Sequence, residues 1–297
     1  MSYARVSTEG DYTGSWSTTA LDTLCGCGYR FYRRYVLKDR RAPTLRQIRG
    51  TVMHRIIARG LGRKRDTGEN PGVEQARDEA ATEFDRQYDS GVTLTVDDLD
   101  LGTRQAAGQT KDYVVDVSGF HAGVVAPKIQ PVAVERLIEV RPVGTDLKIV
   151  GKLDLVERGA HGGEIIADTK TAEKSPASTA AQTSEQLTMY TLLRTAETKR
   201  LPESLRLDYL VRTPKQKQVK HVPLATSRGI PDLQAYLRRL STAVEGVKKG
   251  VFLPAQPGAW FCSERYCEYF RDCPYVTTRP VTVTVPDAVH SPNAQEE

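Results

Sequence analysis

The sequence predicts an α/β or α+β fold, in which helices surround a modest central sheet. Three observations lead to this prediction. Segments with strand-like alternation gather between residues 134 and 171, glycine-containing turns separate them, and segments with helical periodicity lie on both sides. The chain has 297 residues, of which 39% are hydrophobic and 27% charged, so it can bury its own core.

The ends of the chain are expected to be flexible and to flank one domain at residues 16–277. Residues 1–15 are small and polar, and residues 278–297 end in a mixture of Pro, Asn and Glu. No stretch approaches the roughly 20 apolar residues of a membrane helix, and no apolar signal-peptide core opens the sequence. We therefore expect a cytoplasmic protein without a membrane partner.

A basic run follows the expected N-terminal segment. Thirteen Lys or Arg residues and a single acid lie between residues 30 and 65, although the net charge of the chain is only +5. Two interpretations are open, a solvated helix face or a nucleic-acid surface. The interleaved Phe31, Tyr32 and Tyr35 favour the second, because aromatic rings stack on bases while arginines hold phosphates.

Helices are expected before and after the strands. Residues 74–90 have an acidic helical pattern, and residues 95–117 form a second helical stretch. Beyond the strands, apolar residues at helical spacing predict helices over residues 189–196 and 233–247, and Gly250 ends the second of them.

Three consecutive strands are expected at residues 134–142, 146–157 and 163–171. Alternation in the second strand places two sets of residues on opposite faces. One face carries Leu147, Ile149, Leu153 and Leu155, and the other carries Val150, Lys152, Asp154 and Val156. Asp154 is therefore expected to point away from the more apolar face.

Two carboxylates are expected to meet on neighbouring strands. If the intervening turn centres on His161, antiparallel pairing sets Asp154 opposite Asp168, and Lys170 shares a face with Asp168. Like charges placed opposite each other are destabilising, so the pair points to a bound cation, for which Mg²⁺ or Mn²⁺ fits better than Zn²⁺. The alternative is that these are ordinary polar positions on an amphipathic strand, since D-x-K is a very weak signal by itself.

Five cysteines do not indicate a disulfide framework, because the number is odd and the cytoplasm is reducing. Cys25 and Cys27 lie near one end of the sequence, and Cys262, Cys267 and Cys273 lie near the other. We therefore expect the two ends of the domain to meet. Metal binding, a cluster or catalysis would each explain the thiols.

Four short motifs occur in a specific order. They are GTVMH, ending at His54, GKLD, ending at Asp154, DTK at residues 168–170, and QLTMY at residues 186–190. In this order they resemble the G-x-x-x-H, G-x-x-D, (D/E)-x-K and Q-x-x-x-Y motifs of the PD-(D/E)XK nuclease superfamily. Within it, they are similar to the RecB-like exonucleases with an iron–sulfur cluster, such as the AddB nuclease domain and the CRISPR-associated RecB-like exonucleases.

The resemblance implies a restriction-endonuclease-like core, a central mixed sheet flanked by helices, with the two ends joined by a metal cluster. The implied metal ligands are His54, Asp154, Asp168 and the carbonyl of Thr169. Lys170 would orient the attacking water or stabilise the charge of the transition state. Gln186 and Tyr190, which lie one helical turn apart, would order the lysine or touch DNA. The third motif departs from the family in having Asp168 where Glu is common.

The terminal segments CGYRFYRRYV and CSERYCEYFRDC resemble the cluster-binding ends of the same family, so the likeness spans about residues 20–275. It implies a 4Fe-4S cluster on four cysteines: Cys27, Cys262, Cys267 and Cys273. Cys25 would be a spare thiol, because the family pattern places the ligand directly before the aromatic and basic run. Zinc and unligated thiols remain as alternatives.

The function implied is that of a metal-dependent DNA exonuclease, which hydrolyses phosphodiester bonds in recombination, repair or phage DNA processing. Its DNA would be single-stranded or have free ends, and helicase, recombination or integration proteins would be its partners. One alternative is a nuclease subunit active only within a helicase or CRISPR integration complex. The other is a non-catalytic DNA-binding module, against which the complete set of His54, Asp154, Asp168 and Lys170 argues.

Overall fold

The computed structural model describes residues 14–143, 147–213 and 218–276. Most of the expected N-terminal segment and all of the expected C-terminal tail lie outside these ranges. The chain divides into two units, Met1–Ala255 and Gln256–Glu297, and the sheet and its helices belong to the first. No helix in the described ranges is both long and apolar enough to cross a membrane.

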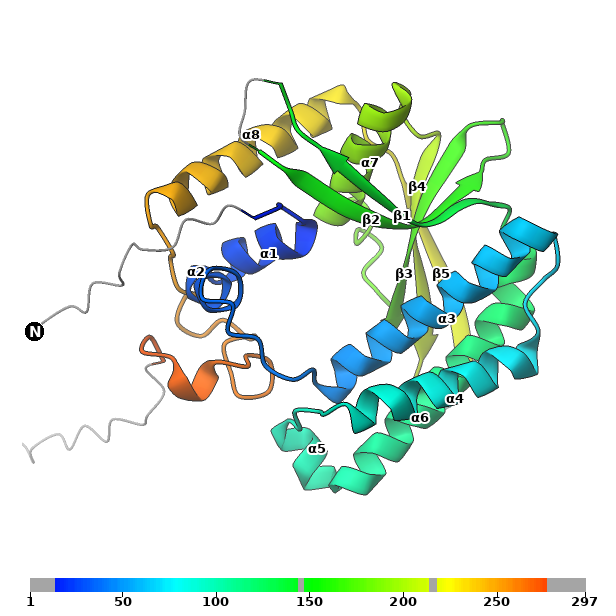
Figure 1. The fold of residues 1–297 in the computed structure, drawn as a ribbon, viewed down its shortest axis with the longest axis horizontal. Helices are drawn as coiled ribbons and strands as arrows, with labels where there is room; N and C mark the ends of the chain where they lie inside the picture. Colours follow the sequence, from blue (N-terminus) through cyan, green and yellow to red (C-terminus); the bar gives the residue numbers. More distant parts are fainter. Residues whose placement is uncertain (1–13, 144–146, 214–217, 277–297) are drawn as a thin grey trace, which may run out of the picture. The chain divides into compact units, whose positions relative to one another are not determined.

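A five-stranded sheet lies at the centre of the first unit (Figure 1), in the order β1-β2-β3-β4-β5. The strands are β1 Pro131–Val140, β2 Ile149–Arg158, β3 Glu164–Ala172, β4 Ser204–Arg212 and β5 Val219–Thr226. β3 and β4 are parallel and every other neighbouring pair is antiparallel. The sheet is therefore mixed, as predicted, although the strand predictions did not include β4 and β5.

Helices cover both faces of this sheet (Figure 1). On one face lie α1 Thr18–Gly26, α7 Glu185–Thr198 and α8 Ile230–Lys248, and on the other lie α3 Leu45–Thr67, α4 Val73–Asp89 and α6 Thr103–Phe120. The shorter helices are α2 Gly28–Phe31, the π-helical Tyr32–Val36, α5 Val96–Leu101, the π-helical His121–Val125, and the 3₁₀ turns Ala126–Lys128 and Phe270–Asp272. Each face has its own apolar core, so the fold has three layers.

Capping residues define the two helices that reach the site. α3 begins at a capping box, in which Thr44 and Gln47 exchange side-chain and backbone hydrogen bonds, and it ends at Gly68 with a φ of 81°. α7 begins at Ser184, whose hydroxyl accepts a hydrogen bond from the Leu187 amide. α7 forms the crossover between the parallel strands β3 and β4.

The strict alternation predicted for the second strand is wrong near Asp154. Leu153 and Val156 both belong to the core beneath α7, whereas Leu155 belongs to the core beneath α3. The neighbouring strand is irregular at the same level. Glu135, which lies between the β1 residues paired with Leu153 and Leu155, has a left-handed φ of 52° that interrupts regular strand geometry.

Candidate active site

The candidate site lies where β2 and β3 separate. Their ladder ends with Leu155 paired to Ala167, and the next positions in the same register are Asp154 and Asp168. The predicted register is therefore confirmed. Beyond this point β3 remains paired with β4, and β2 with β1, so β2 and β3 diverge and helices from both faces can reach the carboxylates.

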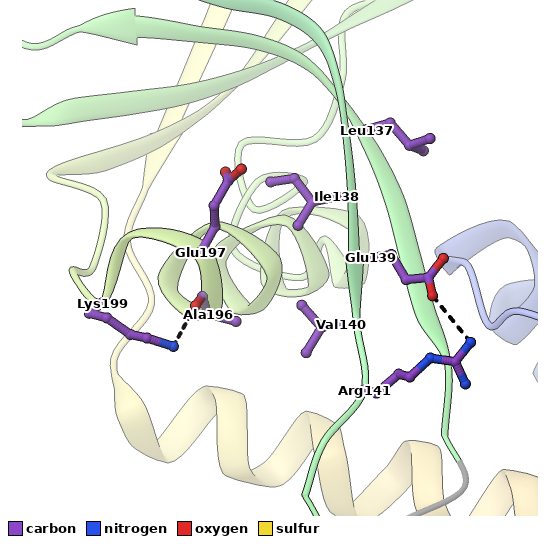
Figure 2. A pocket seen from close by; sticks show the side chains of 8 residues that line it. All are labelled: Leu137, Ile138, Glu139, Val140, Arg141, Ala196, Glu197 and Lys199. Atoms are coloured by element: carbon purple, nitrogen blue, oxygen red, sulfur yellow. Dashed lines mark hydrogen bonds and ion pairs between the residues drawn. The ribbon is translucent and has the colours of Figure 1, made fainter.

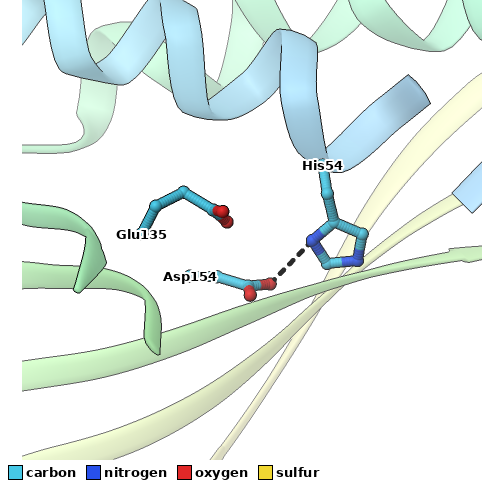
Figure 3. Close-up of side chains that lie close together, drawn as sticks. All are labelled: His54, Glu135 and Asp154. Carbon is cyan, nitrogen blue, oxygen red and sulfur yellow. Dashed lines mark ion pairs between the residues drawn. The ribbon is translucent and has the colours of Figure 1, made fainter. Parts of the chain in front are cut away.

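Three side chains converge at this fork (Figure 3). His54 comes from the middle of α3, Asp154 from β2 and Glu135 from β1, and one ligand atom of each lies within 4.8 Å of the others. His54 Nδ1 is 2.9 Å from Asp154 Oδ2, which also accepts a 3.3 Å hydrogen bond from the Thr169 amide. Glu135 forms an ion pair with the exposed Lys152.

The sequence motifs did not indicate Glu135. It lies in an expected strand between ordinary polar and apolar neighbours, so nothing local distinguishes it from a surface glutamate. The strand at residues 134–142 was expected, and if it pairs with β2 one of its residues must lie beside Asp154. The motifs did not specify the register of this pairing, so they could not show that the residue is Glu135.

Asp168 and Lys170 connect the site to α7. Asp168 is fully buried, its Oδ1 accepts a 2.7 Å hydrogen bond from Gln186 Nε2, and its Oδ2 lies 2.8 Å from Lys170 Nζ. Lys170 Nζ donates to Gln186 Oε1 at 2.6 Å, and Gln186 Nε2 also donates to the Tyr190 hydroxyl at 2.7 Å. The Gln186 amide thus holds the acid, the lysine and the tyrosine together. We call His54, Glu135, Asp154, Asp168 and Lys170 the carboxylate site.

The glycine of the GKLD motif allows α7 to approach this closely. A Cβ atom on Gly151 would lie 2.4 Å from Leu193 Cδ1 on α7, well inside van der Waals contact. Any larger residue would therefore require the buried Leu193 side chain, or α7 with it, to shift. Since Gln186 is on α7, the glycine contributes to the position of the amide that holds Lys170.

The charged groups of the site shift one another's pKa values. Burial raises the pKa of Asp168 to about 6, the charge of Asp154 adds to this rise, and Lys170 opposes it. Burial also disfavours the charged form of Asp154, but the hydrogen bond from His54 holds its pKa below the usual range. Burial lowers the pKa of His54, and Asp154 more than offsets this, so the His54 pKa is raised. The two aspartates repel each other, and a cation between them would relieve the repulsion.

The donor set fits a hard divalent cation. It provides carboxylate oxygens and one imidazole nitrogen and contains no thiolate, which suits Mg²⁺ or Mn²⁺. Asp168 Oδ2 is buried and lies 2.8 Å from Lys170 Nζ, and a carboxylate oxygen with two lone pairs can accept a second partner such as an ion. His54, Glu135, Asp154 and Asp168 could therefore hold such an ion.

The cysteines lie in both units. In the first, Cys27 is the N-cap of α2, and its Sγ accepts hydrogen bonds from the Arg30 amide at 3.5 Å and the Ala255 amide at 3.4 Å. Cys25 is exposed. The segment around Cys27 thus meets the end of the first unit, seven residues before Cys262 in the sequence.

In the second unit, Cys262, Cys267 and Cys273 are half-buried. Within the ranges that the structure covers, no three cysteine sulfurs lie within 4.8 Å of one another. That spacing would be expected around a single zinc ion, whereas each thiolate of an iron–sulfur cluster binds its own iron. The predicted cluster and its ligands stay a prediction.

Much of the basic run is paired within the protein. Arg55 and Arg59 form ion pairs with the buried Glu83, and Arg63 pairs with Glu79 on α4. This half of the run joins α3 to α4, which corresponds to neither interpretation of the sequence. These arginines are occupied by acids of their own chain.

The first half of the run differs. Arg33 is bound to Asp39, so its role is at least partly structural. Lys38, Arg40 and Arg46 are exposed and form no ion pair with the residues whose positions are described. These three exposed cations lie before His54 in the chain, and Arg46, the nearest of them, is eight residues away.

A pocket of about 410 Å³ lies between β1 and the C-terminal end of α7 (Figure 2), and it is separate from the carboxylate site. It is lined by Leu137, Ile138, Glu139, Val140, Arg141, Ala196, Glu197 and Lys199. Its charged groups are engaged locally, since Glu139 pairs with Arg141 at 3.3 Å and Lys199 Nζ donates to the Ala196 carbonyl at 2.7 Å. None of the motif residues lines this pocket.

A comparison with known families agrees with the site geometry. A model of the PD-(D/E)XK nuclease superfamily matches residues 15–274. The chain belongs to this superfamily. The match spans all four motifs, and the mixed sheet flanked by helices is the restriction-endonuclease-like core that the motifs predicted.

Two solved structures are similar to the chain at low sequence identity. A candidate exonuclease from Eubacterium rectale is 13% identical, with a TM-score of 0.46, over 95% of this chain and 97% of that chain. The protein SSO0001 is 17% identical, with a TM-score of 0.32, over 59% of this chain and 71% of that chain. No curated protein matches the chain.

Proposed function

We propose that this protein is a Mg²⁺- or Mn²⁺-dependent deoxyribonuclease, an exonuclease that hydrolyses phosphodiester bonds at DNA ends. The observation that carries the proposal is the meeting of Asp154 and Asp168 at the fork, with His54 and Glu135 beside Asp154 and with Lys170 beside Asp168. Membership of a nuclease superfamily supports it. Recombination, repair or phage DNA processing in the cytoplasm would be its setting.

The residues of the carboxylate site would have different roles in the reaction. A bound ion would act as a Lewis acid and activate water, and His54, Glu135, Asp154 and Asp168 would hold it, with the Thr169 carbonyl as a further ligand. Lys170 would place a fixed positive charge where negative charge develops on the phosphate. Gln186 keeps that charge in place, because its oxygen accepts from Lys170 while Asp168 and Tyr190 hold its nitrogen. A preorganised charge needs no rearrangement during the reaction.

Exposed cations would guide the DNA to this site. Arg46 lies eight residues before His54 on α3, which is about 12 Å along the helix axis. Lys38 and Arg40 precede the same helix. Phosphates bound by these three side chains would lie close enough to deliver the strand to the carboxylates.

The cysteines form the second part of the proposal. A 4Fe-4S cluster on Cys27, Cys262, Cys267 and Cys273 would tie the ends of the chain together. The two amide hydrogen bonds to Cys27 Sγ support its choice over the exposed Cys25, since such bonds tune cluster thiolates.

Iron analysis tests this part. Anaerobically purified protein should be brown and contain about four irons and four labile sulfides per chain. Cys27→Ser should lose the iron, whereas Cys25→Ser should keep it. Colourless protein with zinc, or loss of iron in the Cys25 variant alone, would refute the assignment.

The nuclease activity is tested with end-labelled single-stranded and duplex DNA, incubated with Mg²⁺ or Mn²⁺. We expect stepwise shortening from a free end that requires the metal and is absent in Asp154→Asn protein. Binding without cleavage would instead favour the non-catalytic DNA-binding module. Cleavage that appears only after adding a helicase or integration complex would favour a nuclease subunit.

A further inference from the structure

A half-buried arginine outside the four motifs connects the segment after β5 to the start of α7. Arg228 lies between β5 and α8, and its side chain reaches the loop that leads into α7. Its five N–H groups reach six acceptors. The two N–H groups of Nη2 reach three carbonyls, those of Ala181 at 3.0 Å, Gln182 at 2.7 Å and Ser184 at 3.3 Å. Nη1 donates to the Ser227 carbonyl at 2.8 Å and to Thr226 Oγ1 at 3.0 Å, and Nε donates to Thr188 Oγ1 at 2.8 Å.

No carboxylate among the described residues forms an ion pair with this guanidinium. Burial lowers the pKa of Arg228, and the charge of Asp232 offsets this only in part. The arginine also lies near the N-terminal end of α7, where the helix dipole disfavours a cation. Its hydrogen bonds to the loop must therefore outweigh both costs.

The segment that Arg228 holds determines where Gln186 lies. Ser184, one of its acceptors, is the N-cap of α7, and Thr188 is in the first turn. Gln186 is between them, and its amide contacts both Lys170 and Asp168. The guanidinium therefore clamps the chain on both sides of Gln186.

We propose that Arg228 is a positioning residue for the carboxylate site, which acts by fixing the first turn of α7 so that Gln186 orients Lys170 and Asp168. This inference rests on the proposed nuclease activity. The fork geometry of the guanidinium, rather than its charge alone, carries the effect, because several acceptors are held at once.

A double-mutant cycle tests the route through Gln186. Arg228→Ala should lower kcat by about 10- to 100-fold, the effect of displacing a catalytic group by about 1 Å, while KM for DNA changes less than about twofold. Arg228→Lys should not restore kcat. In a Gln186→Ala background, adding Arg228→Ala should change kcat by less than about twofold, because the route is already interrupted.

Arg239→Ala is the matched control. Arg239 pairs with Glu185 in the same turn of α7 but is itself half-exposed, with 53% of its side chain accessible. Its loss should change kcat by less than about twofold. Additive effects of Arg228→Ala and Gln186→Ala, or rescue by lysine, would overturn the inference.

Hydrogen exchange provides a measurement independent of activity. The peptide covering residues 181–190 should exchange faster in the Arg228→Ala protein than in the wild type, and not in the Arg239→Ala protein. Thr188→Val removes a single acceptor and should give a smaller change of the same sign if Arg228→Ala does not fold. Unchanged exchange in both variants would refute the clamp. A wild-type protein that does not cleave DNA would refute the proposed function, whereas the exchange result would still decide the clamp.

Discussion

Two clusters of buried charge occur three residues apart along β2, and they are organised differently. Asp154 belongs to the carboxylate site. Glu157 belongs to the Arg206 cluster, which consists of Glu157, Arg206, Asp208 and His221. In that cluster Arg206 lies between the two acids, 2.5 Å from Glu157 and 2.8 Å from Asp208, and His221 lies 2.7 Å from Asp208.

The pKa values of one aspartate from each cluster show the effect of pairing an acid with cations of the same chain. Both Asp208 and Asp168 are buried. Burial by itself raises the pKa of each, but the hydrogen bonds from His221 and Arg206 hold the pKa of Asp208 below its usual range, whereas that of Asp168 rises to about 6 beside Asp154. Asp208 is separated from the neighbouring Glu157 by Arg206, which pairs with both acids, whereas no arginine lies between Asp168 and Asp154 among the described residues. Buried acids that are paired with cations of the same chain stabilise a fold. At the carboxylate site the acids are not fully neutralised in this way, so the site can accept a cation as a ligand.

The largest expected effect is the loss of cleavage when an acid of the carboxylate site is replaced, because replacing an acid of the Arg206 cluster should affect stability instead. Asp154→Asn should lower the cleavage rate on the order of 10³-fold, because a metal ligand and its charge are lost. Its free energy of unfolding should change by less than about 1 kcal/mol, because one of two mutually repelling charges is removed. Cleavage of end-labelled DNA and urea unfolding measure the two quantities.

Asp208→Asn should have the reverse effects. It removes the charged partner of His221 and one of the two charged partners of Arg206, which keeps only Glu157, so the free energy of unfolding should fall by about 3–5 kcal/mol. The cleavage rate per folded molecule should stay within a few-fold of the wild type. If the Asp208 variant lost activity without losing stability, the comparison would be wrong.

Acid should weaken the fold through His121, which lies beside the Arg206 cluster. His121 is buried near Asp208 and His221, and burial lowers its pKa to about 4. Between about pH 6.5 and 4 the unfolded chain binds a proton at His121 and the native protein does not. The free energy of unfolding should therefore decrease as the pH falls through this window, by up to about 3 kcal/mol.

Urea unfolding at several pH values between 7.5 and 4 measures this decrease. His121→Asn cannot titrate in this range, so it should reduce the pH dependence. The same dependence in the variant and the wild type would assign the proton to another group.

A divalent cation should bind at the carboxylate site and not at the Arg206 cluster. Mn²⁺ that binds only the native state stabilises it by about 2.7 kcal/mol at a concentration 100-fold above Kd. We expect this increase in the wild type and in Asp208→Asn protein, measured as a shift of the thermal midpoint. Asp154→Asn protein should show little or no shift. An equal shift in the Asp154 variant would place the ion elsewhere.

The fork could be predicted because its determinants are local. A short turn defines the register of two consecutive antiparallel strands, and this places Asp154 opposite Asp168 although the alternation fails beside Asp154. The spacing of Gln186 and Tyr190 places them on one helical face. The family model then confirms the superfamily that the order of the motifs predicted.

The remaining features depend on contacts between distant segments. β4 was not predicted because it is buried and its apolar residues do not alternate strictly, and its Arg206 and Asp208 resemble surface residues until Glu157 lies beside them. Glu135 joins the carboxylate site through a left-handed backbone conformation that no residue type there requires. Arg228 binds mainly backbone carbonyls, which carry no sequence signature.

The basic run also contains both paired and exposed cations, and mutations there should have the smallest effect, a change in the salt dependence of DNA binding. Replacing Lys38, Arg40 and Arg46 by Gln should lower the slope of log K against log salt concentration for DNA binding by up to about 3, since each lost phosphate contact contributes about 0.9 for duplex DNA. Replacing Arg55 and Arg59 should leave this slope unchanged and lower the free energy of unfolding instead, because both pair with the buried Glu83. Titrations of labelled DNA at several salt concentrations measure the slopes. If the two sets of variants changed the slope equally, the intramolecular ion pairs would not exclude Arg55 and Arg59 from the DNA surface, and the division of the run would have to be abandoned.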